Sequence, residues 1–207
     1  TLGSLTAYTT AFAVLGDEAL FIARDEAAGT ELWKTDGTPG GTVMVKDINP
    51  DSGDAHPYDL TYENGTLFFS ADGPDGVELW KSDGTDGGTM MVKDIRPGAS
   101  SSYPRSNTNI DGTLYFSADN GTHGRELWKS DGTAAGTVMV KDIKTGADSS
   151  SPSSLTEFNG QLYFRADDGT HGQELWKSDG TEAGTVLVED IFPGISEIGR
   201  ASCRERV

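Results

Sequence analysis

Hard oxygen donors stand at matching positions in two loops of the sequence. Asp119 and Asn120 occupy one loop, and Asp167 and Asp168 occupy the other. Carboxylate and amide oxygens are the ligands that Ca²⁺ prefers. The spacing differs from that of an EF-hand loop, however, and Asp or Asn beside Gly also forms turns without a metal. Calcium is therefore the one cofactor that the sequence suggests, and a metal-free turn is the competing interpretation.

Two histidines share one position in these loops, His123 in the first and His171 in the second. An earlier copy of the loop has Ala28 at that position, and no cysteine or further histidine surrounds either imidazole. Zinc sites need four such ligands, so the pattern does not favour zinc. We take the two histidines and the four oxygen donors together as candidate binding residues. His56 stands alone and is interpreted as a solvated loop residue.

Internal repetition sets the positions of all these residues. The four tryptophans recur every 47 or 48 residues, each within a Glu-Leu-Trp-Lys-(Ser/Thr)-Asp-Gly-Thr segment. Such a period indicates a tandem array of one structural unit. The array covers residues 1–196, in repeats of about 9–56, 57–103, 104–151 and 152–196.

Each repeat is expected to form four short strands. In the fourth repeat these are residues 154–158, 162–164, 174–177 and 185–188, which are rich in aromatic and β-branched side chains. Asn159-Gly160 between the first two strands predicts a two-residue hairpin turn, because both residues tolerate positive φ. No helical periodicity of useful length is present.

A single four-stranded meander cannot bury both of its apolar faces, so neighbouring sheets must cover them. Four strands in a period of 40 to 50 residues are typical of propeller blades. We therefore predict an all-β, β-propeller-like array of four-stranded antiparallel blades, forming an open partial propeller; a β-solenoid is the alternative. The indoles are expected to anchor the packing between blades rather than to stack on a ligand. These structural residues are Trp33, Trp80, Trp128 and Trp176.

The loop between the third and fourth strands predicts a strand register. Trp33 should lie opposite Met44, and Glu31 opposite Lys46 as an exposed ion pair. The same offset pairs Glu78 with Lys93, Glu126 with Lys141 and, as like charges, Glu174 with Glu189.

Antiparallel geometry sorts the loops into two rims. The turn rim holds the Asn-Gly turns and the Asp-Gly-Thr loops. The link rim holds the loops between second and third strands, such as 166–172, and the links between repeats, such as 97–102. The link rim is longer and more varied, so the sequence favours it as the binding face.

The Asp-Gly-Thr loop is similar to a variant of the Asp-box found in sialidase propellers, although its spacing differs and the terminal aromatic residue is missing. In those enzymes the box resembles a structural turn, which implies a structural role for Asp36, Asp83, Asp131 and Asp179. A sialidase-like enzyme would also need arginines that converge on a carboxylate, but the arginines here occupy unrelated repeat positions. No nucleophile and base pair stands out. We expect no catalytic residue and no enzyme activity.

The repeated segment, followed by Gly-Thr and Val-Lys-Asp-Ile, resembles the bacterial ELWxxDGT repeat family over about residues 9–196. The resemblance implies a secreted or surface-attached bacterial scaffold without an assigned activity. We therefore expect a non-catalytic repeat scaffold that mediates adhesion or binding of an extracellular glycan or protein through one loop rim. A segment of a propeller glycosidase or lyase is the alternative, and a pure spacer is a third interpretation. The remaining blades of a longer chain are a further expected partner.

Composition excludes several other classes. The 207 residues contain 33 acidic against 16 Lys and Arg side chains, for a net charge of −17. Such a surface repels polyanions, so neither nucleic acid nor an anionic membrane is an expected partner. No apolar run reaches the roughly 18 residues of a membrane span, and no membrane insertion is expected.

Residues 197–207 match nothing earlier in composition or pattern and include the single cysteine, Cys203. They resemble the translation of a sequencing-library adapter. We interpret them as a non-native tail and exclude them from the fold.

Overall fold

The computed structural model describes residues 6–50, 53–191 and 193, with the side chains of residues 7–11 omitted. The described residues form sixteen strands and no helix. In chain order the strands are β1 (Thr6–Leu15), β2 (Glu18–Asp25), β3 (Gly29–Thr35), β4 (Val43–Lys46), β5 (Tyr58–Glu63), β6 (Thr66–Gly73), β7 (Gly76–Ser82), β8 (Met90–Lys93), β9 (Arg105–Ile110), β10 (Thr113–Asp119), β11 (Arg125–Ser130), β12 (Val138–Lys141), β13 (Ser153–Phe158), β14 (Gln161–Asp167), β15 (Gln173–Ser178) and β16 (Val186–Glu189).

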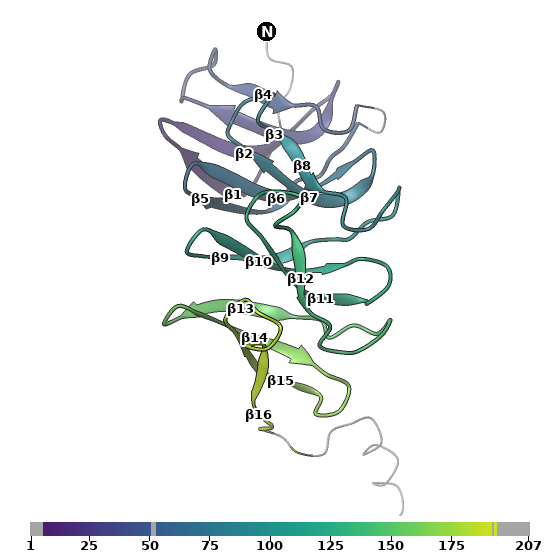
Figure 1. Cartoon of the computed structure of the whole chain (residues 1–207). Coiled ribbons are helices and arrows are strands. Elements are labelled where there is room, and N and C mark those ends of the chain that lie inside the picture. The colour runs from purple at the N-terminus through teal and green to yellow at the C-terminus, as the bar shows by residue number, and fades with distance from the viewer. Residues whose placement is uncertain (1–5, 51–52, 192, 194–207) are drawn as a thin grey trace, which may run out of the picture.

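Each group of four consecutive strands forms its own antiparallel meander, in the orders β1-β2-β3-β4, β5-β6-β7-β8, β9-β10-β11-β12 and β13-β14-β15-β16. The four sheets follow one another in chain order along the stack, with the first and the last at opposite ends (Figure 1). The first strands of successive sheets contact one another, as blades do near a common axis. The predicted all-β, open propeller-like architecture is confirmed.

The tight turns between first and second strands have the predicted backbone. Asn159 and Gly160 have φ values of 53° and 74°, and both lie in the left-handed region that this two-residue turn requires. Asn64-Gly65 and Asp111-Gly112 repeat this geometry. The local sequence therefore sets the register at which β5, β9 and β13 enter their sheets.

The hydrophobic core lies between successive sheets. Trp80 of the second sheet packs with Leu32, Val45 and Ile48 of the first. Trp128 and Trp176 make the corresponding contacts at the next two interfaces. Trp33 differs, because it packs with Phe21 and Ala23 of its own sheet; it is only 5% exposed.

The register between the third and fourth strands agrees with the prediction at the tryptophan, but it differs at the residue that precedes the tryptophan. Trp33 lies opposite Met44, as expected. A bulge between Leu32 and Trp33 then places Lys46 opposite Leu32, so the predicted pairing with Glu31 is wrong. The same shift occurs in the other three sheets, so Glu174 does not face Glu189 as a like charge.

Residues 197–207, the proposed non-native tail, lie outside the described residues. Within the part of the chain that the structure describes, no helix has the length and apolar character that crossing a bilayer requires.

Replacing Trp128 by Ala tests the packing between sheets. The indole fills the interface with Leu79, Val92 and Ile95, so its removal should lower the free energy of unfolding by about 3 to 5 kcal/mol. Urea unfolding measures the change. Val138→Ala, at an exposed strand position, is the matched control and should cost under about 1 kcal/mol. Equal losses in both variants would contradict this assignment of the core.

Candidate functional site

A buried glutamate ties each sheet to the link that follows it. Glu78 is fully buried, and its Oε2 accepts hydrogen bonds from the Ile95 backbone N–H at 3.0 Å and from the Ser102 hydroxyl at 2.6 Å. Its Oε1 accepts the Ser102 backbone N–H at 3.0 Å. The carbonyl of Ser102 in turn accepts the N–H of Asp119 in the next sheet. The Glu78 carboxylate therefore fixes the position of the link that joins the second and third sheets.

The other repeats use the corresponding glutamate in the same way. Glu126 accepts bonds from Ile143 and Ser150 at 2.6 to 2.9 Å. Glu31 accepts the backbone N–H groups of Ile48 and Ala55. The expectation of an exposed ion pair was wrong, because the bulge turns these carboxylates toward the link backbone instead of toward lysine.

Burial changes the protonation of these carboxyl groups. Loss of water raises the pKa of Glu31 and of Glu78 from 4.5 to about 7, although hydrogen bonds from the link backbone oppose the rise. Burial also raises the pKa of Glu126. Glu31 and Glu78 therefore become harder to keep buried as the pH increases toward and beyond 7.

The candidate binding residues of the link rim are occupied by contacts with their own surroundings. Asp119 pairs with Arg96 at 2.9 Å, and Asp167 pairs with Lys144 at 3.3 Å. Both lysine and arginine come from the link that precedes the sheet. These pairs tie a loop to the link beside it, which is a structural use of carboxylates that the sequence offered as metal ligands.

The other candidates form Asx-type turns within their loops. Asn120 Oδ1 accepts the backbone N–H of His123, and Asp168 Oδ1 accepts that of His171. The His171 Nδ1 atom lies 2.7 Å from Asp168 Oδ2, and this hydrogen bond raises the pKa of His171. His123 instead contacts the Asn120 amide at 3.0 Å.

No group of three or more His, Cys, Asp or Glu side chains suited to a metal ion occurs among the described residues. A calcium site remains a prediction of the sequence that the geometry does not assemble.

Three arginines are engaged within the fold. Arg24 and Arg96 pair with Asp54 and Asp119, and Arg125 donates to backbone carbonyl oxygens. Burial lowers the pKa of Arg125, and the positive charge of the nearby Arg105 lowers it further.

Each Asp-Gly-Thr loop is a closed hydrogen-bonded turn. Asp131 Oδ1 accepts the N–H and the hydroxyl of Thr133, and the hydroxyl of Thr137 donates to the Thr133 carbonyl. A Cβ atom on Gly136 would overlap the Asp131 carboxylate, which explains the glycine at that position. Hydrogen bonds from threonine lower the pKa of this aspartate. The equivalent carboxylates Asp36, Asp83 and Asp179 have the same partners and the same direction of shift.

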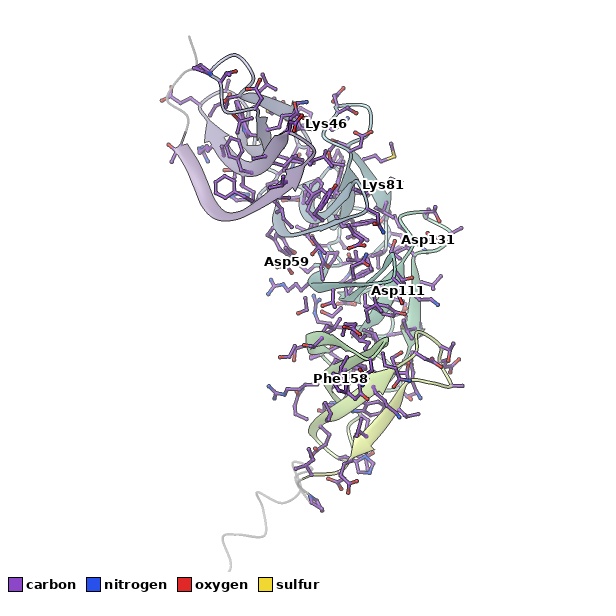
Figure 2. All side chains as sticks on the ribbon, turned by 90° about the vertical axis from the view of Figure 1, so that its left-hand side faces the viewer. Lys46, Asp59, Lys81, Asp111, Asp131 and Phe158 are labelled. Carbon is purple, nitrogen blue, oxygen red and sulfur yellow. The ribbon has the colours of Figure 1, made fainter. Side chains whose placement is uncertain are left out.

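The turn rim contains a cavity of about 620 Å³ at the turns that follow β5, β9 and β13. We call this cavity the turn-rim cavity. Figure 2 shows Asp111 and Asp131 toward the turn-rim side of the stack, and Asp59 on the opposite side. Its lining comes from three successive sheets: Glu63, Asn64, Asn109, Ile110, Asp111, Gly112, Glu157 and Gly160.

Oxygen and amide groups dominate this lining. Among the described residues, the side chains of Glu63 and Asp111 make no hydrogen bond or ion pair, so their carboxylates are available to a ligand. The Nδ2 atom of Asn109 is buried without a partner, while its Oδ1 accepts the Gly112 N–H. The cavity therefore offers carboxylate acceptors that the fold itself does not use, whereas the Asn109 amide nitrogen is buried behind its lining.

Sequence reasoning missed this cavity because it treated the Asn-Gly turns only as hairpin signals. One signal was available. Tyr62, Asn109 and Glu157 hold the same register, each opposite a leucine of the neighbouring strand, yet their chemistry differs from repeat to repeat. Variation at a position inside an otherwise regular repeat indicates a role other than packing.

No family model and no curated protein matches this chain. Among solved structures, it is similar to a puromycin hydrolase, with 16% identity over 89% of this chain and 29% of that chain and a TM-score of 0.57. It is similar to a prolyl endopeptidase, with 16% identity over 86% of this chain and 26% of that one and a TM-score of 0.50. An endo-1,4-β-xylanase from Bacteroides thetaiotaomicron has 13% identity over 91% and 72% of the two chains, at a TM-score of only 0.41.

These likenesses show the fold alone. The neighbours have propeller-type folds, which agrees with the four stacked meanders. The chain spans less than a third of the length of the puromycin hydrolase and of the prolyl endopeptidase.

The raised pKa values predict how stability depends on pH. The unfolded chain releases the proton of Glu78 near pH 4.5, whereas the folded chain holds it until about pH 7. The stabilisation is therefore complete below pH 4.5 and is lost as the pH rises toward 7, by at most about 1.4 kcal/mol per pH unit for each such group. Aspartates such as Asp131, whose pKa is lowered from 3.8, stabilise the fold above that pH.

We therefore expect the free energy of unfolding to fall between about pH 5 and pH 7.5, and to fall less steeply in Glu78→Gln. Urea unfolding across this range measures both slopes. Glu182→Gln, which removes an exposed charge, controls for the change in net charge and should keep the parent slope. Identical slopes in the parent and Glu78→Gln would show that this carboxyl group ionises normally in the fold.

Proposed function

We propose that this chain is a non-catalytic scaffold segment of a secreted or cell-surface bacterial protein. It binds a polar extracellular ligand, a glycan or a protein, through one loop rim. The turn-rim cavity is the observation that carries the proposal. For this reason we propose the turn rim as the binding face, in place of the link rim that the sequence favoured.

The size and chemistry of the cavity support a polar ligand. A volume of about 620 Å³ falls within the range of small-molecule sites. The unengaged carboxylates of Glu63 and Asp111 can accept hydrogen bonds from the hydroxyl groups of a sugar. Tyr62 is 40% exposed next to this lining and adds an aromatic surface.

The polar side chains of the other loops already have partners, which also supports the turn rim as the binding face. In the Asp-Gly-Thr loops and the link-rim loops, polar side chains form hydrogen bonds with the backbone of their own loop or ion pairs with an adjacent link. Side chains held in this way give up existing bonds before they bind anything else. Glu63 and Asp111 at the cavity incur no such cost, whereas Asn109 and Glu157 each already accept one backbone N–H.

The extracellular location rests on the resemblance of the repeats to the ELWxxDGT family. No pair of nucleophile and base stands out in the sequence, which supports a non-catalytic role. The net charge of −17 agrees with partners other than polyanions.

Glycan-array and pull-down binding test the proposal. Asp111→Asn and Glu63→Gln remove charge from the cavity while keeping the shape of the side chains, so each should weaken binding by about tenfold. Asp119→Asn and Asp167→Asn are the matched controls at the link rim and should leave binding unchanged. Loss of binding in the link-rim variants alone would return the site to that rim, and a chain that binds no probe would be a spacer.

The absence of catalysis is tested separately. The chain should not turn over sialosides or acidic polysaccharides at any pH. Turnover that disappears on replacing one Asp or Glu would establish the glycosidase or lyase alternative.

A further inference from the structure

Two arginines of the third sheet meet at the ends of the strands that begin at the link rim. Arg105 is the first residue of β9, and Arg125 is the first residue of β11. They lie opposite Ser117 and Asp119 of β10, which are two residues apart, so both arginines project from the same face of the sheet. The Ser117 hydroxyl lies between them, 3.4 Å from the Arg105 carbonyl oxygen and 3.3 Å from Arg125 Nη1. We call Arg105 and Arg125 the arginine pair.

The arginine pair departs from the repeat at both positions. Tyr58 and Ser153 stand at the position of Arg105 in the second and fourth sheets. Val77 and Gln173 stand at the position of Arg125. The two positions are unrelated along the chain and become neighbours only in the folded sheet. Two such departures side by side indicate a role other than packing.

The backbone holds Arg125 in place. Its Nη1 atom donates to the carbonyl oxygens of Tyr103 and Ser117 at 2.7 and 3.1 Å, and its Nη2 atom donates to that of Ser102 at 3.4 Å. A guanidinium has more N–H donors than these bonds use, and Nε takes part in none of them. Arg125 is therefore a fixed, half-buried cation with donors to spare.

Arg105 is exposed and is oriented by an aromatic ring. Its Cζ atom lies 6.0 Å from the centroid of the Tyr58 ring, which belongs to the preceding sheet. Such a cation–π contact uses the face of the ring and leaves the N–H donors of the guanidinium available. The exposed arginine can therefore turn toward a ligand that Arg125 also reaches.

No carboxylate of the fold neutralises the arginine pair. In the part of the chain that the structure describes, neither guanidinium forms an ion pair. Asp119, opposite Arg125, is paired with Arg96 instead. Two cations that repel one another are unusual in a chain with a net charge of −17. An anion between them would offset that repulsion.

The surroundings indicate which anion fits. Burial raises the pKa of the Tyr58 hydroxyl, the charge of Arg105 opposes the rise and the charge of Asp59 adds to it, so both charges lie near this ring. Asp59 Oδ2 accepts the Ser106 N–H at 2.9 Å, while its Oδ1 has no hydrogen-bond partner among the described residues. A second negative charge on the ligand would be repelled by Asp59, whereas a hydroxyl group would donate to it. The exposed ring of Tyr103 adds an aromatic surface.

We propose that the arginine pair binds the carboxylate of an acidic sugar, such as a uronate. The planar guanidinium groups match the two oxygens of a carboxylate, and Asp59 accepts a hydrogen bond from a hydroxyl group of the same sugar ring.

This site is separate from the turn-rim cavity and does not rest on the proposed function. Arg105 begins β9, whose other end at Ile110 lines the cavity, so the two sites are roughly 17 Å apart at about 3.4 Å per residue. Figure 2 shows Asp59 and Asp111 on opposite sides of the stack, in agreement with this separation.

NMR titration of the whole chain with D-glucuronate at low salt tests the inference. The Nε–H signals of Arg105 and Arg125 should shift, and D-glucuronate should bind at least about tenfold more tightly than D-glucose, which has no carboxylate. Arg105→Gln should weaken the binding at least about tenfold, and Arg105→Lys should recover only part of the loss, because lysine lacks the planar fork. Arg165→Gln removes an exposed arginine of the fourth sheet and is the matched control, which should bind as the parent does.

A parent chain that binds the two sugars equally, or binds neither, would overturn the proposal. Equal losses in Arg105→Gln and Arg165→Gln would do the same, because they would reflect net charge alone. Tighter binding of inorganic phosphate or of glycine would replace the acidic sugar by a phosphate ligand or an amino acid. Circular dichroism of each variant separates these results from loss of folding.

One further outcome distinguishes this site from the turn-rim cavity. Glucuronate binding that survives in Arg105→Gln but is lost in Glu63→Gln would place the sugar in the cavity. That result would overturn the present inference and support the proposed function, so the two proposals fail separately.

Discussion

The arrangement of this chain depends on a carboxyl group that is buried in each repeat and binds the backbone of the link to the next sheet. Ser102 illustrates the consequence, since its N–H is held by Glu78 of one sheet and its carbonyl by Asp119 of the next. These two hydrogen bonds, each 3.0 Å long, fix the distance between the two blades, and the indoles can fill the space between them reproducibly. Placing a glutamate inside the protein costs solvation, which appears as a pKa raised to about 7.

Because every sheet is spaced in this way, each one presents the same kind of apolar surface to its successor. The repeat therefore builds the same interface three times among the described sheets, with Val45 and Ile48, Val92 and Ile95, and Val140 and Ile143 at equivalent positions.

The two rims differ in whether their polar side chains already have partners within the fold. Loops that hold neighbouring blades together use their polar groups internally, so their richness in Asp, Asn and His does not make them available to ligands. The tight turns do not hold neighbouring blades together in this way, and the described structure shows no hydrogen bond or ion pair of the Glu63 and Asp111 side chains that line the cavity. Sequence variety in a loop therefore does not by itself show which polar side chains remain without hydrogen-bond partners.

The sequence alone determined the repeat, the four strands of each unit and the turns, because these depend on local φ preferences and on a period visible along the chain. It also indicated the burial of the tryptophans, since a short meander with two apolar faces must be covered. It could not reveal the bulge before Trp33, which depends on how the link returns across the sheet and which turns Glu31 from a surface ion pair into a buried anchor. The turn-rim cavity likewise required the tertiary structure, since Glu63, Asp111 and Glu157 lie about one repeat apart in the chain and meet only when three sheets stack.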